Sequence, residues 1–148
     1  MSGQFEATTE INRPVEEVFA FLAAGTNDPK FSPRVQSIAK TPDGPTAVGT
    51  IFTSTVKDAG MKSGRKFRIT EFEPPHRIRW AEVSKNIVTA DEGGYDLEST
   101  GASSTRVRIF NVLSGHGIGK LLVGFALSAA RKDADAFGGR IKAAVEAS

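Results

Sequence analysis

Residues 114–145 read SGHGIGKLLVGFALSAARKDADAFGGRIKAAV, and the spacing of apolar residues in this segment indicates the fold. From Ile118 to Val145, apolar side chains recur at the three- and four-residue spacing of a helix. The pattern predicts a long amphipathic C-terminal helix over residues 118–147. Its apolar stripe has to be covered by another part of the chain, so we expect the preceding residues to form a sheet that packs against it.

Upstream of this helix, the pattern changes to the alternation that is typical of half-buried strands. In the first such segment, Phe5 and Ala7 fall on one side and Glu6 and Thr8 on the other. Strands are predicted over residues 4–11, 35–41, 50–57, 65–72, 77–84, 90–98 and 105–113. Turn-forming sequences separate them, with a Pro-Asp-Gly-Pro turn at residues 42–45 and loops at residues 58–64 and 99–104.

A short helix is predicted directly after the first strand. Pro14 suits the first turn of a helix, and the acidic Glu16 is favourable near the positive end of the helix dipole. Apolar residues follow at helical spacing from Val15 to Leu22, and residues 26–34 predict a turn or a second short helix. The fold class is therefore α+β, with a curved antiparallel sheet of about seven strands around one long helix. One helix does not cover such a sheet completely, which leaves room for a cavity.

Composition excludes several classes of chemistry. The 148 residues contain no cysteine and two histidines, His76 and His116, and the formal net charge is +2. Disulfides and cysteine nucleophiles are ruled out, and we expect no metal site and no cofactor. No run of apolar residues is long enough to span a membrane, and the first ten residues lack a signal-peptide pattern. We expect a soluble, cytoplasmic protein, either a monomer or a homodimer.

Several local sequences carry a resemblance to a known family. They are Ile11 to Phe19 (INRPVEEVF), Pro33-Arg34-Val35, Val48-Gly49-Thr50, Glu71 to Pro75 (EFEPP), Tyr95 to Glu98 (YDLE) and Ser104 to Val107 (STRV). In these segments the chain resembles the START/Bet v 1-like (SRPBCC) superfamily, in its polyketide cyclase/dehydrase and lipid-transport branch. The resemblance implies a helix-grip fold and one ligand-binding domain over residues 1–148. It also implies binding of lipids, polyketides or other apolar molecules, although the family tends to have tryptophan where Phe31 stands.

The side chains expected to line the cavity are mostly apolar or aromatic. Alternation along the strands places one set on the concave face of the sheet, the long helix adds a second set, and the resemblance adds Phe31. The predicted ligand-binding residues are Phe31, Phe52, Phe67, Ile69, Trp80, Glu82, Tyr95, Ile109, Asn111, Leu122, Phe125 and Ala129. The alternative is a filled core, because aromatic residues at strand spacing are more often core than cavity wall.

Two titratable residues are candidates for catalysis. Glu82 shares a face with Trp80 and therefore points inward, where a carboxylate needs a partner or a raised pKa. Glu82 is a candidate acid/base, and the alternative is an ion pair with a basic side chain or contact with water. His116 precedes the long helix and is a second candidate, with a solvated loop residue as the alternative. Asn111 is a candidate hydrogen-bond donor to a ligand or a satisfied buried amide.

Six basic side chains alternate with apolar neighbours and are expected on the convex face of the sheet: Lys66, Arg68, Arg77, Arg79, Arg106 and Arg108. Asp96 and Glu98 share this face and are expected to pair with Arg106 and Arg108 across a hairpin. The other four cations show no obvious acidic partner and could form a positive patch that binds another protein. Because no exposed aromatic residues are interleaved with them, we expect no nucleic-acid partner.

We therefore predict that the protein binds a small hydrophobic or amphipathic ligand, lipid- or polyketide-like, between the sheet and the C-terminal helix. A non-catalytic carrier is favoured because few titratable groups point inward. The alternative is a cyclase or dehydratase that acts on a polyketide-like substrate with Glu82 or His116 as acid/base, and with Asn111 or Tyr95 orienting the substrate.

Overall fold

The computed structural model describes residues 2–58 and 60–148 and shows a seven-stranded sheet, two α-helices and one short 3-10 helix. The elements in chain order are β1 (Ser2–Ile11), α1 (Val15–Ala23), η1 (Asp28–Lys30), β2 (Val35–Thr41), β3 (Ile51–Asp58), β4 (Met61–Glu73), β5 (Arg77–Glu82), β6 (Val88–Gly101), β7 (Ser104–Gly115) and α2 (Gly119–Glu146). This is the helix-grip α+β architecture that the sequence predicts.

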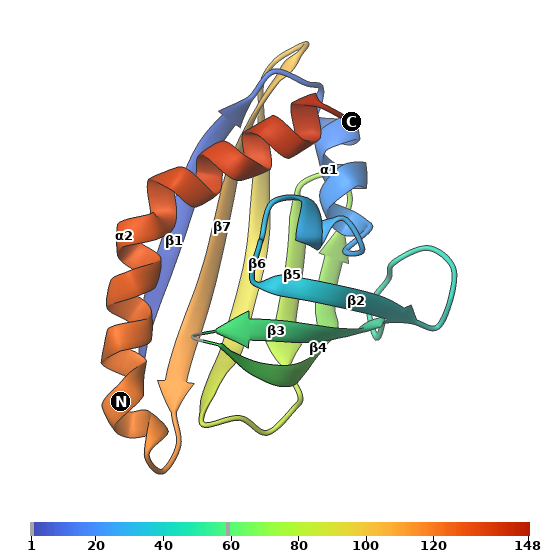
Figure 1. Ribbon diagram of the computed structural model, residues 1–148. Coiled ribbons are helices and arrows are strands. Elements are labelled where there is room, and N and C mark those ends of the chain that lie inside the picture. The colour runs from blue at the N-terminus through green and yellow to red at the C-terminus, as the bar shows by residue number, and fades with distance from the viewer. Residues whose placement is uncertain (1, 59) are drawn as a thin grey trace.

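The sheet is antiparallel throughout, in the order β1-β7-β6-β5-β4-β3-β2. Figure 1 shows the long strands β1, β7 and β6 running alongside α2. Strands β4, β3 and β2, at the other edge of the sheet, run across the direction of these long strands. All seven predicted strands are confirmed, but the predicted loop at residues 58–64 is wrong beyond its first residues, because β4 begins at Met61. Ala59 of that loop lies outside the described residues.

Helix α1 packs its apolar side against the sheet. Val15, Val18, Phe19, Phe21 and Leu22 are the buried residues of α1. The chain then reverses at Gly25, which has φ +67°. A Cβ at this position would lie 2.3 Å from the Phe52 ring, so only glycine permits both this backbone conformation and this contact. This reversal places Asp28 of η1 on the inner side of the sheet.

Helix α2 packs on β1 and β7, and its buried side chains differ from those predicted. The residues that face the sheet include Val123, Leu127, Ile141 and Val145, at 0–4% exposure. Leu122, Phe125 and Ala129, which the sequence placed on this side, are exposed, with Phe125 at 76%. The prediction was wrong because the helix begins with several apolar residues on both of its faces.

Four of the six basic residues expected on the convex face pair with acidic side chains: Arg77, Arg79, Arg106 and Arg108. Arg106 and Arg108 contact Glu98 (3.6 Å) and Asp96 (3.0 Å), as predicted. The expectation that Arg77 and Arg79 lack acidic partners is wrong: the Arg77 Nε lies 2.9 Å from Glu71, and the Arg79 Nη2 lies 2.8 Å from Asp96. Arg79 is also only 7% exposed, and its guanidinium lies 4.9 Å from the centre of the Phe110 ring.

None of the helices in residues 2–58 and 60–148 combines the length and the apolar character that crossing a bilayer requires.

Candidate functional site

A cavity of about 420 Å³ lies between the concave face of the sheet, η1 and the C-terminal half of α2. This volume is within the range of pockets that hold small organic molecules. Most of the wall is apolar or aromatic. The sheet contributes Phe5, Ala7, Phe52, Val56, Phe67, Ile69, Ile78, Trp80, Tyr95 and Ile109, and α2 contributes Ala130, Ala134 and Phe137.

Eight of the residues predicted to bind a ligand line this cavity: Phe31, Phe52, Phe67, Ile69, Trp80, Tyr95, Ile109 and Asn111. Leu122, Phe125 and Ala129 do not, since they face away from the sheet. Their place is taken by Ala130, Ala134 and Phe137, which continue the buried series that runs through Leu127 and Ile141. Glu82 is also absent from the wall, for a different reason.

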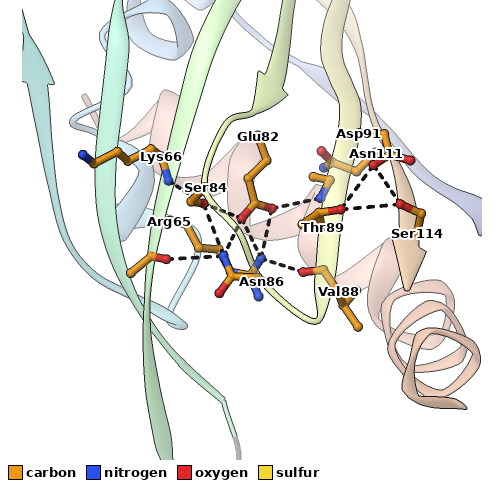
Figure 2. A network of polar contacts seen from close by, with 12 residues as sticks. Arg65, Lys66, Glu82, Ser84, Asn86, Val88, Thr89, Asp91, Asn111 and Ser114 are labelled. Atoms are coloured by element: carbon orange, nitrogen blue, oxygen red, sulfur yellow. Dashed lines mark hydrogen bonds and ion pairs between the residues drawn. The ribbon is translucent and has the colours of Figure 1, made fainter. Parts of the chain in front are cut away.

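Glu82 points inward, as predicted, but its carboxylate is fully engaged (Figure 2). Its Oε1 accepts hydrogen bonds from the Arg65 guanidinium (3.0 Å) and the Ala90 backbone N–H (2.9 Å). Its Oε2 accepts from the Ser84 hydroxyl and the Asn86 amide, both at 2.7 Å. With its side chain 0% exposed, Glu82 cannot contact a ligand in the cavity. Its role is to tie β4, β5 and the β5–β6 loop together, which is the alternative that the sequence left open.

His116 lies outside the cavity wall as well. Its ring is exposed, and its Nε2 lies 2.9 Å from the Thr89 hydroxyl. Thr89 in turn donates to Asp91, which also accepts from Ser114 (Figure 2). Glu82 and His116 therefore do not meet at one point of the cavity. Across residues 2–58 and 60–148, no cluster of three or more His, Asp or Glu side chains could hold a metal ion.

Asn111 and Trp80 form a hydrogen-bonded pair within the apolar wall. The Trp80 indole Nε1–H donates to the Asn111 Oδ1 at 3.0 Å. The Trp80 ring also meets the Tyr95 ring edge to face, with 5.2 Å between centres. The Asn111 Oδ1 is thus occupied within the protein, which leaves its amide N–H groups as the part that a ligand could use.

Asp28 and Tyr95 are two titratable groups of the wall whose side chains have no partner among the described residues. Among the described residues, no hydrogen bond or ion pair reaches the Asp28 carboxyl or the Tyr95 hydroxyl, although both line the cavity. Burial raises the pKa of Asp28 from 3.8 to about 7. Burial, and secondly the charge of Asp28, raise the pKa of the Tyr95 hydroxyl well above 10. At neutral pH the cavity therefore presents a carboxyl that can hold or release a proton, near a neutral phenol.

The cations of the wall are already engaged. Arg140 reaches Asp133 at 2.7 Å and donates from its Nε to the Phe31 carbonyl at 3.1 Å. Arg65 donates through its Nη1 to Glu82, while its buried Nε–H has no partner within the described part of the chain. The wall therefore offers hydrogen-bond donors but no free counter-charge near Asp28. The rings of Phe31 and Phe137 meet edge to face in this wall, with 5.9 Å between their centres.

Two parts of this site were missed in the sequence. Asp28 precedes Pro29 in a segment that predicts a turn or a second short helix, and nothing local indicates that this segment lies against a cavity. The cavity side of α2 carries a clearer signal. Counting back from Ile141 by four and three residues reaches Phe137, Ala134, Ala130 and Leu127, an unbroken series that selects the correct face.

The fold and cavity define a class of protein: a helix-grip domain with a largely apolar internal site. Residues 2–146 match the family described as polyketide cyclase / dehydrase and lipid transport, and the chain belongs to that family. Phe31, where the family tends to have tryptophan, still lines the cavity. No protein with a curated functional description matches the chain.

Solved structures share the fold at low sequence identity. The ZhuI aromatase/cyclase from Streptomyces sp. R1128 is 15% identical with a TM-score of 0.78, over 99% of this chain and 94% of that one. The protein TTHA0849 from Thermus thermophilus is 17% identical with a TM-score of 0.78, over 98% of each chain. A START superfamily protein from Mycobacterium smegmatis is 15% identical with a TM-score of 0.71, over 95% of this chain and 97% of that one. At such identities the likeness concerns the fold.

Proposed function

We propose that this protein binds a small, mostly apolar molecule that carries one polar group, in the cavity between the sheet and α2. The observation that carries the proposal is the pairing of an apolar, aromatic wall with two unpartnered polar groups, Asp28 and Tyr95. A buried polar group without a partner costs free energy, and a ligand that hydrogen-bonds to it recovers part of that cost. Burial of the ligand against the apolar wall would supply most of the affinity, and hydrogen bonds to Asp28 and Tyr95 would fix the orientation of the ligand.

The chemistry of the pair favours a neutral ligand with a hydrogen-bond acceptor, such as a ketone. A protonated carboxyl and a phenol both donate hydrogen bonds. A ligand carboxylate would meet Asp28 without a free cation beside it, since Arg65 and Arg140 are engaged with Glu82 and Asp133. An anionic fatty-acid head group therefore fits this part of the wall poorly.

Fluorescent probes test this proposal directly. Prodan, a neutral naphthyl ketone, should bind with enhanced and blue-shifted emission. Ala134→Trp projects into the cavity from α2 and should abolish binding, whereas Ala129→Trp on the exposed side of the same helix should leave it unchanged. Circular dichroism and urea unfolding establish that both variants fold. Equal binding by the two folded variants would contradict the proposal. Native mass spectrometry of protein from its own host then identifies the natural ligand.

A second function, cyclase or dehydratase chemistry, is favoured by Asp28 alone. A carboxyl that titrates near neutral pH can transfer protons to and from a bound polyketone, and Tyr95 can orient the carbonyl. In this proposal Asp28 replaces Glu82 and His116 as the acid/base. Asp28→Asn should retain ligand binding but stop the loss of water from a linear poly-β-ketone, followed by mass spectrometry. Turnover that survives in Asp28→Asn would rule this mechanism out.

A further inference from the structure

The N-terminal half of α2 carries apolar side chains that the fold leaves in the open. Leu121 and Phe125 are 75% and 76% exposed, and Ile118, Leu122 and Ile87 are also exposed. Four of these residues lie at the start of α2: Ile118, Leu121, Leu122 and Phe125. At 100° per residue they span an arc of about 100° around the helix axis and so form one continuous face. We name Ile87, Ile118, Leu121, Leu122 and Phe125 the α2 apolar patch.

This patch is preformed, because two chain segments are fixed to each other beneath it. The carbonyl of Ile87, in the loop between β5 and β6, accepts a hydrogen bond from the His116 backbone N–H at 2.8 Å. A Cβ on Gly119 would lie 1.7 Å from the same carbonyl oxygen, so only glycine allows the helix to start this close to the loop. Ile87 therefore keeps its position beside the first turns of α2.

The charges around the patch are positive. Residues 115–132 include Lys120, Arg131 and Lys132 but no aspartate or glutamate, and the neighbouring loop adds Lys85. Within the described part of the chain, none of the three lysines forms an ion pair, whereas Arg131 donates to the Gln4 carbonyl.

Three acidic residues follow these segments in the sequence: Asp91 and Asp133, which are engaged, and Asp135, which is exposed. Asp91 accepts hydrogen bonds from Thr89 and Ser114, and Asp133, the first acidic residue of α2, pairs with Arg140. The patch is thus an apolar surface bordered by free cations.

We propose that the α2 apolar patch docks the protein onto an anionic lipid surface. Apolar side chains inserted at the headgroup boundary and lysines facing anionic headgroups are the two attractions that such a surface offers. A second copy of the chain fits less well, because a two-fold contact through this face would bring Lys85, Lys120 and Lys132 of both copies together.

Docking at this face would also bring the membrane near the cavity. Asp133 and Arg140 line the cavity and lie on the same helix. Phe125 and Asp133 are eight residues apart, which is about 12 Å along the axis. An apolar ligand could therefore pass between bilayer and cavity over a short distance. The docking itself does not depend on the proposed ligand function.

Vesicle flotation tests the proposal. The wild-type protein should float with phosphatidylcholine vesicles that contain phosphatidylglycerol, and less with pure phosphatidylcholine or at raised salt. The double variant Leu121→Ser/Phe125→Ser should lower the partition coefficient at least about tenfold. Lys120→Glu/Lys132→Glu should lower it by about tenfold on anionic vesicles. The control Val48→Ser/Met61→Ser removes two apolar residues that are exposed elsewhere, at 64% and 76%, and should leave flotation unchanged.

Three results would overturn the proposal: no binding of the wild type to anionic vesicles, unchanged binding of Leu121→Ser/Phe125→Ser, or light scattering that shows a wild-type dimer which this variant converts to a monomer. The last result would assign the patch to a second copy of the chain. Prodan binding measured on the same variants separates this test from the proposed ligand function. A variant that loses flotation but still binds prodan has lost docking alone.

Discussion

Glu82 and Asp28 are two acidic residues under the same sheet, and their surroundings are opposite. The Glu82 carboxylate receives hydrogen bonds from Arg65, Ser84, Asn86 and the Ala90 backbone, and its side chain is closed to solvent. The Asp28 carboxyl lines a cavity and receives none from the described residues. A satisfied buried carboxylate stabilises the fold, whereas an unsatisfied one at a cavity wall is available to a ligand. The comparison shows that burial alone does not identify a functional acid.

The largest expected effect is on the Glu82 side. Glu82→Gln leaves the Arg65 guanidinium without its counter-charge and should lower the free energy of unfolding by about 3–5 kcal/mol. Urea unfolding at neutral pH measures the change. Glu98→Gln is the control, since Glu98 is 71% exposed in its pair with Arg106 and its loss should cost less than about 1 kcal/mol. Equal losses in the two variants would show that the buried Glu82 contacts stabilise the fold no more than an exposed ion pair does.

The next effect concerns the pH dependence of stability at Asp28. Its pKa is raised from 3.8 to about 7 in the folded state, so its contribution is fully present below pH 3.8 and is lost as pH rises through 7. Asp28→Asn removes this loss, and the variant should gain up to about 4 kcal/mol on the wild type between pH 4 and pH 8.5. Urea unfolding across this pH range gives the difference curve.

Asp133 serves as a control of opposite sign. Its hydrogen bond with Arg140 lowers the pKa of its carboxyl, so its contribution is present at neutral pH and is lost as pH falls through the lowered pKa. Asp133→Asn should therefore be less stable than the wild type at neutral pH, with a difference that shrinks in acid. A flat difference curve for Asp28→Asn would mean that Asp28 is not held in an apolar setting.

A smaller effect is expected on ligand affinity at Tyr95. Tyr95→Phe removes one hydroxyl from the wall and should weaken prodan binding about fivefold, which corresponds to one hydrogen bond of about 1 kcal/mol. N-phenyl-1-naphthylamine, which lacks a carbonyl, should bind the variant and the wild type equally. Fluorescence titration of both probes gives the two affinities. Equal weakening of both probes would show that the hydroxyl does not act through a hydrogen bond to the ligand carbonyl.

The smallest effect is expected at His116. His116→Ala removes an exposed ring that contacts Thr89, and it should change the free energy of unfolding by less than about 1 kcal/mol. Prodan affinity should stay within about twofold, since the residue does not line the cavity. A large loss of prodan binding would show that His116 contacts the ligand and belongs to the site.

The sequence predicted which side chains of most strands point to the concave side of the sheet, because the alternation of apolar and polar residues is a local property. Trp80, Tyr95 and Ile109 point to the concave face in the structure, as their spacing indicates. The face of α2 was not predicted correctly, because Ile118, Leu121 and Phe125 add apolar residues outside the buried stripe. Hydrophobicity alone does not distinguish a side chain that packs from one that the fold leaves exposed.

The element order, the antiparallel sheet beside a long helix and the exclusion of cysteine chemistry all follow from the periodicity and composition of the amino-acid sequence. Which acid lacks a partner follows only from the three-dimensional arrangement of the chain. Glu82 and Arg65 are seventeen residues apart and meet because β4 and β5 pair. Asp28 reaches the cavity because Gly25 turns η1 under the sheet. Whether a carboxyl has a partner depends on contacts between distant segments, and no local pattern in the chain records those contacts.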